Sequence, residues 1–125
     1  MKRKPKRKMN VKLLRRIQRW LMRLRHPEHF DMNSFGEKGN CGTSYCIAGK
    51  ALQLKGYELG EGDFYSPKGK RVRIEDTAAS LLGLTLDEAS RLFYQSNWPP
   101  EFRGDRTPQE AVRRIEHFIE TEGQE

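Results

Sequence analysis

The sequence has few cysteines, no long apolar run and no acidic side chain in its first 25 residues. Two cysteines in 125 residues are too few for the disulfide framework of a small secreted domain, which favours a reducing compartment. No segment approaches the roughly 20 consecutive apolar residues of a membrane-spanning helix, and no apolar stretch of signal-peptide type follows the basic start. These absences predict a cytoplasmic protein.

The sequence also lacks motifs that are typical of common enzyme classes. It has no phosphate-cradling glycine-rich loop of the Walker kind and no G-x-S-x-G segment. No two carboxylates form a convincing acid–base pair. The aspartates are instead expected to lie in turns and helix caps, where their carboxylates bond backbone N–H groups. These aspartates are Asp31, Asp63, Asp76, Asp87 and Asp105.

What the chain does have is an uneven distribution of charge. Of its 24 lysines and arginines, 12 lie in the first 25 residues, while the other hundred residues hold 12 basic and 17 acidic side chains. The net charge of +7 therefore divides into a cationic head of +12 and a body of −5. A chain of this length with 35% hydrophobic residues is expected to form one domain with a modest core, spanning residues 10–121.

Residues 1–9 are predicted to form a disordered basic arm, because a block of like charges repels itself and cannot collapse. From Asn10, a fair N-cap, apolar residues recur at helical spacing through residues 10–25. These apolar residues share one side of the helix and are expected to face the core: Leu13, Leu14, Ile17, Trp20, Leu21 and Leu24.

The opposite side of the same helix carries only cations, with no acidic residue to relieve their repulsion. A solvated face or a localisation signal would also fit, but the pattern favours binding to a polyanion. The predicted nucleic-acid-binding residues are Lys2, Arg3, Lys4, Lys6, Arg7, Lys8, Lys12, Arg15, Arg16, Arg19 and Arg23.

The rest of the chain predicts a mostly α domain of five helices with one short β-hairpin. Residues 30–40 are expected to be a loop, and 45–54 a small buried helix capped by the Gly42–Thr43–Ser44 segment. Residues 63–74 have the composition of a hairpin. Helices are expected over 75–84, closed by Gly83, over 86–95, opened by a Thr85–Glu88 capping box, and from Thr107 to Gly123, with a second capping box at Glu110.

The most enzyme-like segment is residues 41–46, CGTSYC. A cysteine at a helix N-terminus feels the positive end of the helix dipole, which predicts a lowered pKa for Cys46 and makes Cys46 and Cys41 candidate nucleophiles. A thiolate also needs a base, and His117 is the candidate, although its helical position predicts that it points to water. The structural alternative is a small buried cysteine at a tight helix start.

Two further arrangements of these residues stay open. His26, His29, Cys41 and Cys46 are a donor set of the right types for tetrahedral zinc, although the spacing H-x2-H-x11-C-x4-C is unusual. Alternatively, a disulfide between Cys41 and Cys46 could serve as a redox switch.

A loop near residue 100 mixes aromatic and basic side chains, as single-strand-binding proteins do. It contains Trp98, Phe102, Arg103 and Arg106. A tryptophan beside two prolines equally predicts a residue that covers a small core.

Four segments together resemble a family of small, uncharacterised bacterial and phage proteins. They are CGTSYCIAGKAL at 41–52, AASLLGLTLDEASRLF at 78–93, NWPPEF at 97–102 and TPQEAVRRIEHFI at 107–119. The likeness spans residues 27–120, excludes the arm, and implies a fold but no mechanism. Lys50 and Phe35 stand where the family commonly has tryptophan. The positions that the resemblance carries over are Cys41, Gly42, Thr43, Cys46, Ile47, Ala48, Gly49, Trp98, Pro99 and His117.

The sequence therefore predicts a non-enzymatic protein that binds RNA or DNA backbone through its arm and first helix. A thiol or zinc enzyme centred on Cys41 and Cys46 is one alternative. Another is an adaptor at an anionic membrane or an acidic protein surface, because a basic amphipathic helix also suits a lipid interface. In that case the apolar side of the helix should be unburied in the free protein.

Overall fold

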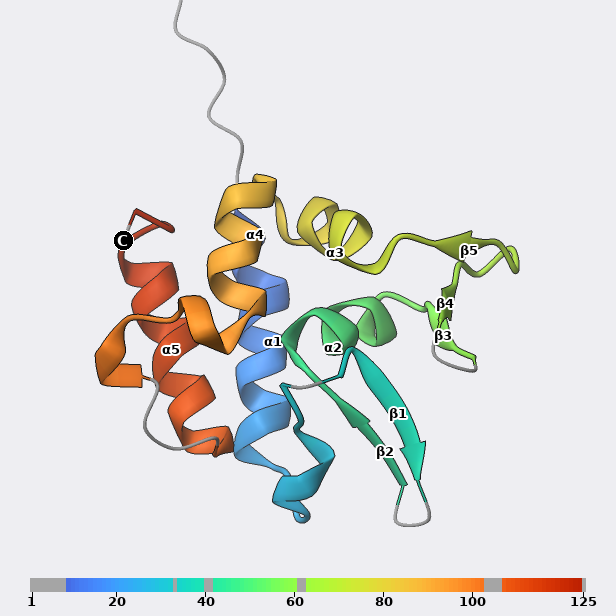
Figure 1. Cartoon of the computed structure of the whole chain (residues 1–125), viewed down its shortest axis with the longest axis horizontal. Helices are drawn as coiled ribbons and strands as arrows, with labels where there is room; N and C mark the ends of the chain where they lie inside the picture. Colours follow the sequence, from blue (N-terminus) through green and yellow to red (C-terminus); the bar gives the residue numbers. More distant parts are fainter. Residues whose placement is uncertain (1–8, 33, 40–41, 61–62, 103–106, 125) are drawn as a thin grey trace, which may run out of the picture.

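The computed structural model describes residues 9–32, 34–39, 42–60, 63–102 and 107–124. Over these ranges the chain forms five α-helices and two small antiparallel sheets (Figure 1), which confirms the mostly α fold. The α-helices are α1 (Val11–Met22), α2 (Ile47–Leu54), α3 (Ile74–Leu82), α4 (Leu86–Phe93) and α5 (Pro108–Glu120). Short 3-10 helices are η1 (Pro27–His29), η2 (Gln95–Asn97) and η3 (Pro100–Phe102).

Helix α1 begins where the sequence predicts. The Asn10 side chain accepts a hydrogen bond of 3.0 Å from the backbone N–H of Leu13 and donates one of 3.1 Å to the carbonyl of Leu81. The second bond ties the start of α1 to the end of α3. The helix ends at Met22, earlier than the predicted residue 25, and leaves the chain free to turn before Pro27.

A hairpin occupies part of the segment expected to be a loop. Strand β1 (Gly36–Gly39) pairs antiparallel with β2 (Gly42–Tyr45), with Gly36 opposite Tyr45. The predicted cap residues 42–44 therefore lie in a strand, and the true N-cap of α2 is Cys46, whose Sγ accepts from the N–H of Gly49 at 3.4 Å. The alternation that usually marks a strand is missing from this glycine-rich segment.

The predicted hairpin at 63–74 is confirmed and gains a third strand. The sheet order is β3 (Glu58–Leu59), β4 (Phe64–Tyr65) and β5 (Arg71–Val72), all antiparallel. Each strand has only two residues, so a sequence pattern cannot reveal β3. In Figure 1 this sheet lies beyond α2 and α3, at the opposite end of the molecule from α5.

The remaining helices are bounded by the predicted signals. Gly83 closes α3 in the left-handed conformation at φ 70°, and the Thr85–Glu88 capping box opens α4 with both bonds present, at 3.0 and 2.8 Å. Thr107 caps α5 through a 3.1 Å bond from the N–H of Glu110. The predicted capping box at Glu110 is only half formed, because the Glu110 carboxylate contacts Arg113 at 2.7 Å instead of the Thr107 backbone.

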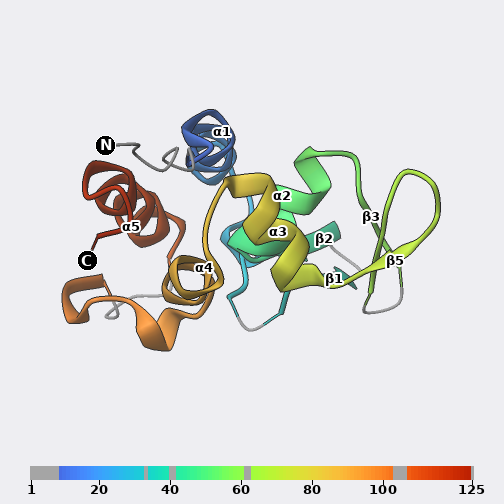
Figure 2. The same ribbon diagram turned by 90° about the horizontal axis from the view of Figure 1, so that it is seen from above.

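The core gathers the apolar sides of all five helices, and α1 lies at its edge. Viewed from above, α1 stands between α5 and α2 (Figure 2). Trp98 covers the core as the structural interpretation predicts: it is 2% exposed, and its Nε1 donates to the carbonyl of Leu92 at 2.8 Å. The fully buried side chains of the core include Leu14, Ile17, Ile47, Leu52, Phe64, Leu82, Leu92, Phe93, Ile115 and Phe118.

Candidate nucleic-acid interface

The outward side of α1 presents four exposed cations, Lys12, Arg16, Arg19 and Arg23, here called the cationic face. At 100° per residue they fall within an arc of about 60°, and at 1.5 Å per residue they extend over roughly 16 Å. Within the described ranges none of them forms an ion pair. The inward side of α1 is buried, so the face points away from the domain.

Arg15, which the sequence also predicts to bind nucleic acid, differs from these four cations because it has an acidic partner within the domain. Its guanidinium forms a short ion pair with Glu116 of α5, and Gln18 bridges the two, accepting from Arg15 at 2.8 Å and donating to Glu116 at 3.3 Å. The hydrogen bond raises the pKa of Arg15 and lowers that of Glu116. Arg15 sits at the margin of the cationic side, next to α5, and serves helix packing.

The arm residues predicted to bind nucleic acid lie outside the described residues. They are Lys2, Arg3, Lys4, Lys6, Arg7 and Lys8. The sequence places their six positive charges immediately before α1.

Lys50, which the sequence analysis did not assign to binding, adjoins the other margin of the cationic face. Its Nζ lies 4.6 Å from the ring centre of Trp20 and 5.2 Å from that of Tyr45. Trp20 also packs edge-on against Tyr45 and Phe30, at 6.4 and 6.3 Å. Lysine thus stands over an aromatic floor at the place where the family resemblance implies an aromatic residue.

A different arginine is wholly internal. Arg114 of α5 is 0% exposed, and its guanidinium lies 5.5 to 5.9 Å from the ring centres of Trp98, Phe102 and Phe118. Its Nη2 donates to the carbonyl of Arg91 at 3.1 Å. Not every cation of the chain is therefore available to a partner. Arg103 and Arg106 of the predicted aromatic–basic loop lie outside the described residues.

The apolar side of α1 does not meet the condition set by the membrane-adaptor alternative. Leu13, Leu14, Ile17 and Leu21 are at most 2% exposed, so α1 cannot place them in a lipid interface while the domain is folded. None of the helices in the described part of the chain is both long enough and apolar enough to cross a membrane.

The environment of Cys46 confirms the predicted small buried cysteine at a tight helix start and contradicts the predicted lowering of its pKa. The thiol is 2% exposed, and burial raises its pKa to about 11 despite the hydrogen bond from Gly49. Such a thiol is almost entirely protonated at neutral pH, which disfavours a nucleophilic role. Cys41, its partner in the predicted enzyme site and disulfide, lies outside the described residues.

We expect Cys46 to react slowly with thiol reagents. In a Cys41→Ser background at pH 8, the raised pKa reduces the thiolate fraction roughly a hundredfold relative to an unshifted thiol. Burial slows the reaction further. Labelling rates of the native and the urea-unfolded protein would measure this difference, and equal rates would show that Cys46 is accessible and reactive after all.

The histidines make other contacts than those predicted. The rings of His26 and His29 lie 5.2 Å apart in a tilted arrangement, and Nδ1 of His26 lies 3.6 Å from Glu28. His117 is half-buried, with its ring 5.2 Å from that of Phe102, so it does not point simply to water. Over the described ranges no three His, Cys, Asp or Glu side chains come close enough to hold a metal ion.

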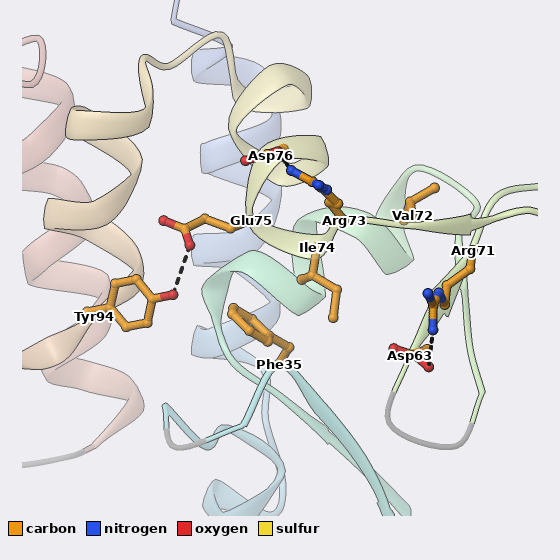
Figure 3. Close-up of a pocket in the computed structure, with 9 residues that line it drawn as sticks. All are labelled: Phe35, Asp63, Arg71, Val72, Arg73, Ile74, Glu75, Asp76 and Tyr94. Carbon is orange, nitrogen blue, oxygen red and sulfur yellow. Dashed lines mark hydrogen bonds and ion pairs between the residues drawn. The ribbon is translucent and has the colours of Figure 1, made fainter.

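The molecule also has a concave site of about 430 Å³ between the β5 end of the small sheet and α4 (Figure 3). Arg71 pairs with Asp63 at 3.8 Å and Arg73 with Asp76 at 3.7 Å, while the Tyr94 hydroxyl donates to Glu75 at 2.9 Å. Both arginines are thus paired with aspartates and Glu75 adds one further negative charge, so the site does not continue the cationic face. Its lining comprises Phe35, Asp63, Arg71, Val72, Arg73, Ile74, Glu75, Asp76 and Tyr94.

Comparison with known proteins adds no further constraint. No family model, curated protein or solved structure matches the chain. The resemblance carried by the four segments therefore stays a prediction, and the function has to be inferred from the geometry of α1.

Proposed function

We propose that this protein binds nucleic acid through the phosphate backbone, using the cationic face of α1 together with the basic arm. The observation that carries the proposal is the placement of four exposed cations on one side of a helix whose other side is anchored in the core. The helix backbone that carries these cations is already ordered, so binding has to order only the side chains and not the backbone.

The charge pattern itself supports a polyanion. Lys12 and Arg16, and again Arg19 and Arg23, are like charges one turn apart, an arrangement that destabilises a helix by about 0.2–0.5 kcal/mol per pair. Carboxylates on neighbouring elements could relieve this repulsion, as Glu116 does for Arg15. The cationic face has no such partner among the described residues. A phosphate backbone would supply the missing negative charge.

The dimensions of the face agree with a nucleic-acid strand. Successive phosphates of one strand of a duplex rise about 3.4 Å along its axis, so the roughly 16 Å of α1, laid along that axis, spans about five phosphates, enough for one per cation. Contacts of this kind position a protein on a backbone and do not read bases. We therefore propose affinity for RNA and DNA without strong sequence preference.

The test is the salt dependence of binding to a fluorescein-labelled DNA duplex, followed by fluorescence anisotropy. Four phosphate contacts predict a slope of about −3.6 in log K against log salt, steepening to about −9 if the six cations of residues 2–8 also bind. Even with the shallower slope, raising the salt concentration from 50 to 200 mM is expected to weaken the affinity about a hundredfold. A flat salt profile would contradict the proposal. Equally tight binding to polyglutamate would indicate the acidic-protein adaptor instead.

A further inference from the structure

Lys50 of α2 is positioned as a fixed cation at the junction of α1 and α2. The side chain is half-buried, and its ammonium group lies over the Trp20 and Tyr45 rings at 4.6 and 5.2 Å. Both rings are themselves held by edge-on packing, so they form a rigid floor. A lysine on such a floor has lost much of the rotamer freedom that an exposed lysine would give up on binding.

A second cation stands beside it. Arg16 is one helical turn before Trp20 on α1, and it belongs to the cationic face. Burial lowers the pKa of Lys50, and the nearby charge of Arg16 lowers it further. The Lys50 ammonium lies over Trp20, and Arg16 lies one turn from Trp20 on α1, so both cations belong to the same side of the α1–α2 junction. Within the described ranges neither side chain has a carboxylate partner.

We propose that Arg16 and Lys50 form a phosphate subsite, through which a nucleic-acid backbone bound along α1 continues onto α2. The subsite deepens the proposed function and rests on it. The two side chains have complementary chemistry: arginine offers a planar fork that matches two phosphate oxygens, and lysine a compact point charge. A phosphodiester between them would replace repulsion by two charge-assisted contacts.

The decisive variant is Lys50→Met, which removes the charge while keeping an unbranched apolar stem on the Trp20 and Tyr45 rings. Its matched control is Lys55→Met, because Lys55 follows the same helix, is exposed and carries the same charge. In the full chain, binding of the labelled duplex and of a labelled single strand is measured over a range of salt. Lys50→Met should weaken binding fivefold to tenfold at about 0.1 M salt and make the slope shallower by about one, whereas Lys55→Met should leave the slope unchanged.

The outcomes separate the two proposals. If wild type shows the steep slope but Lys50→Met behaves like Lys55→Met, the subsite is wrong and binding by α1 stands. If wild type has no salt-dependent affinity for either probe, both proposals fall. A Lys50→Arg variant that restores the slope would support a phosphate contact over a purely structural role. Lys50-dependent binding to vesicles of anionic phospholipid, without binding to the oligonucleotides, would overturn the nucleic-acid assignment.

Discussion

Replacing Gly49 with alanine is expected to destabilise the fold by at least about 3 kcal/mol. A Cβ at this position would lie 1.6 Å from the carbonyl oxygen and 2.7 Å from the carbonyl carbon of Phe35. Both are backbone atoms, so no side chain can rotate away to make room. Either α2 or the strand entrance at Phe35 must move, and α2 is fully packed through Ile47, Ala48 and Leu52.

Urea denaturation with linear extrapolation would measure this effect. Gly69→Ala is the suitable control, since Gly69 has a positive φ of 82° but no atom within 4 Å of its would-be Cβ. That variant should lose only about 1 kcal/mol, from backbone strain alone. A Gly49→Ala protein as stable as the Gly69→Ala control would show that α2 is not clamped against Phe35.

Destabilisation by Gly49→Ala would also give a structural reason for the sequence of residues 41–46 and Gly49, the segment that looks most like a catalytic motif. Cys46 caps α2 through its Sγ, the N–H that it accepts from belongs to Gly49, and Gly49 in turn lies against Phe35. The spacing of cysteine and glycine thus follows from a tight helix start. The same burial that makes Cys46 a good structural cap raises its pKa to about 11, away from the range of a reactive thiol.

Local signals in the sequence were sufficient for most of the helix boundaries. Asn10, Thr85 with Glu88, Thr107 and Gly83 each act on a backbone group within a few residues, so their effect can be inferred without knowing the fold. Strands β1, β2 and β3 were not predicted, for the opposite reason. Their pairing depends on partner strands, and these short segments lack the alternation and the run of β-branched side chains that mark a strand.

The residues of the candidate site also fall into those that the sequence could predict and those that depend on the fold. Helical periodicity placed Lys12, Arg16, Arg19 and Arg23 on one exposed side of α1, because that inference needs only the 3.6-residue repeat. The roles of Arg15 and Lys50 could not be inferred, since each depends on a helix far away in sequence. Glu116 reaches Arg15 from α5, 101 residues later, and Lys50 reaches Trp20 from α2.

Reversing the charge of the cationic face should abolish binding to nucleic acid and leave the fold intact. The variant is Lys12→Glu, Arg16→Glu, Arg19→Glu and Arg23→Glu. Removing four phosphate contacts alone weakens binding by at least about a thousandfold at 0.1 M salt, and the new carboxylates add repulsion. All four side chains are exposed, so their replacement disturbs no packed contact. Arg15 is kept, because its loss would break the ion pair with Glu116 that joins α1 to α5.

The control must change the net charge by the same amount at another place. Four exposed cations serve this purpose: Lys55 after α2, Lys68 and Lys70 between β4 and β5, and Arg73 just before α3. Their joint replacement by glutamate reverses as many charges. If position matters, this control should retain most of the affinity, because exposed charges more than about 10 Å from the bound backbone are largely screened at 0.1 M salt. Anisotropy titrations and thermal melts of both variants provide the comparison. Equal losses of affinity would mean that binding depends only on the net charge of the chain. That outcome would contradict the proposal that α1 is the interface.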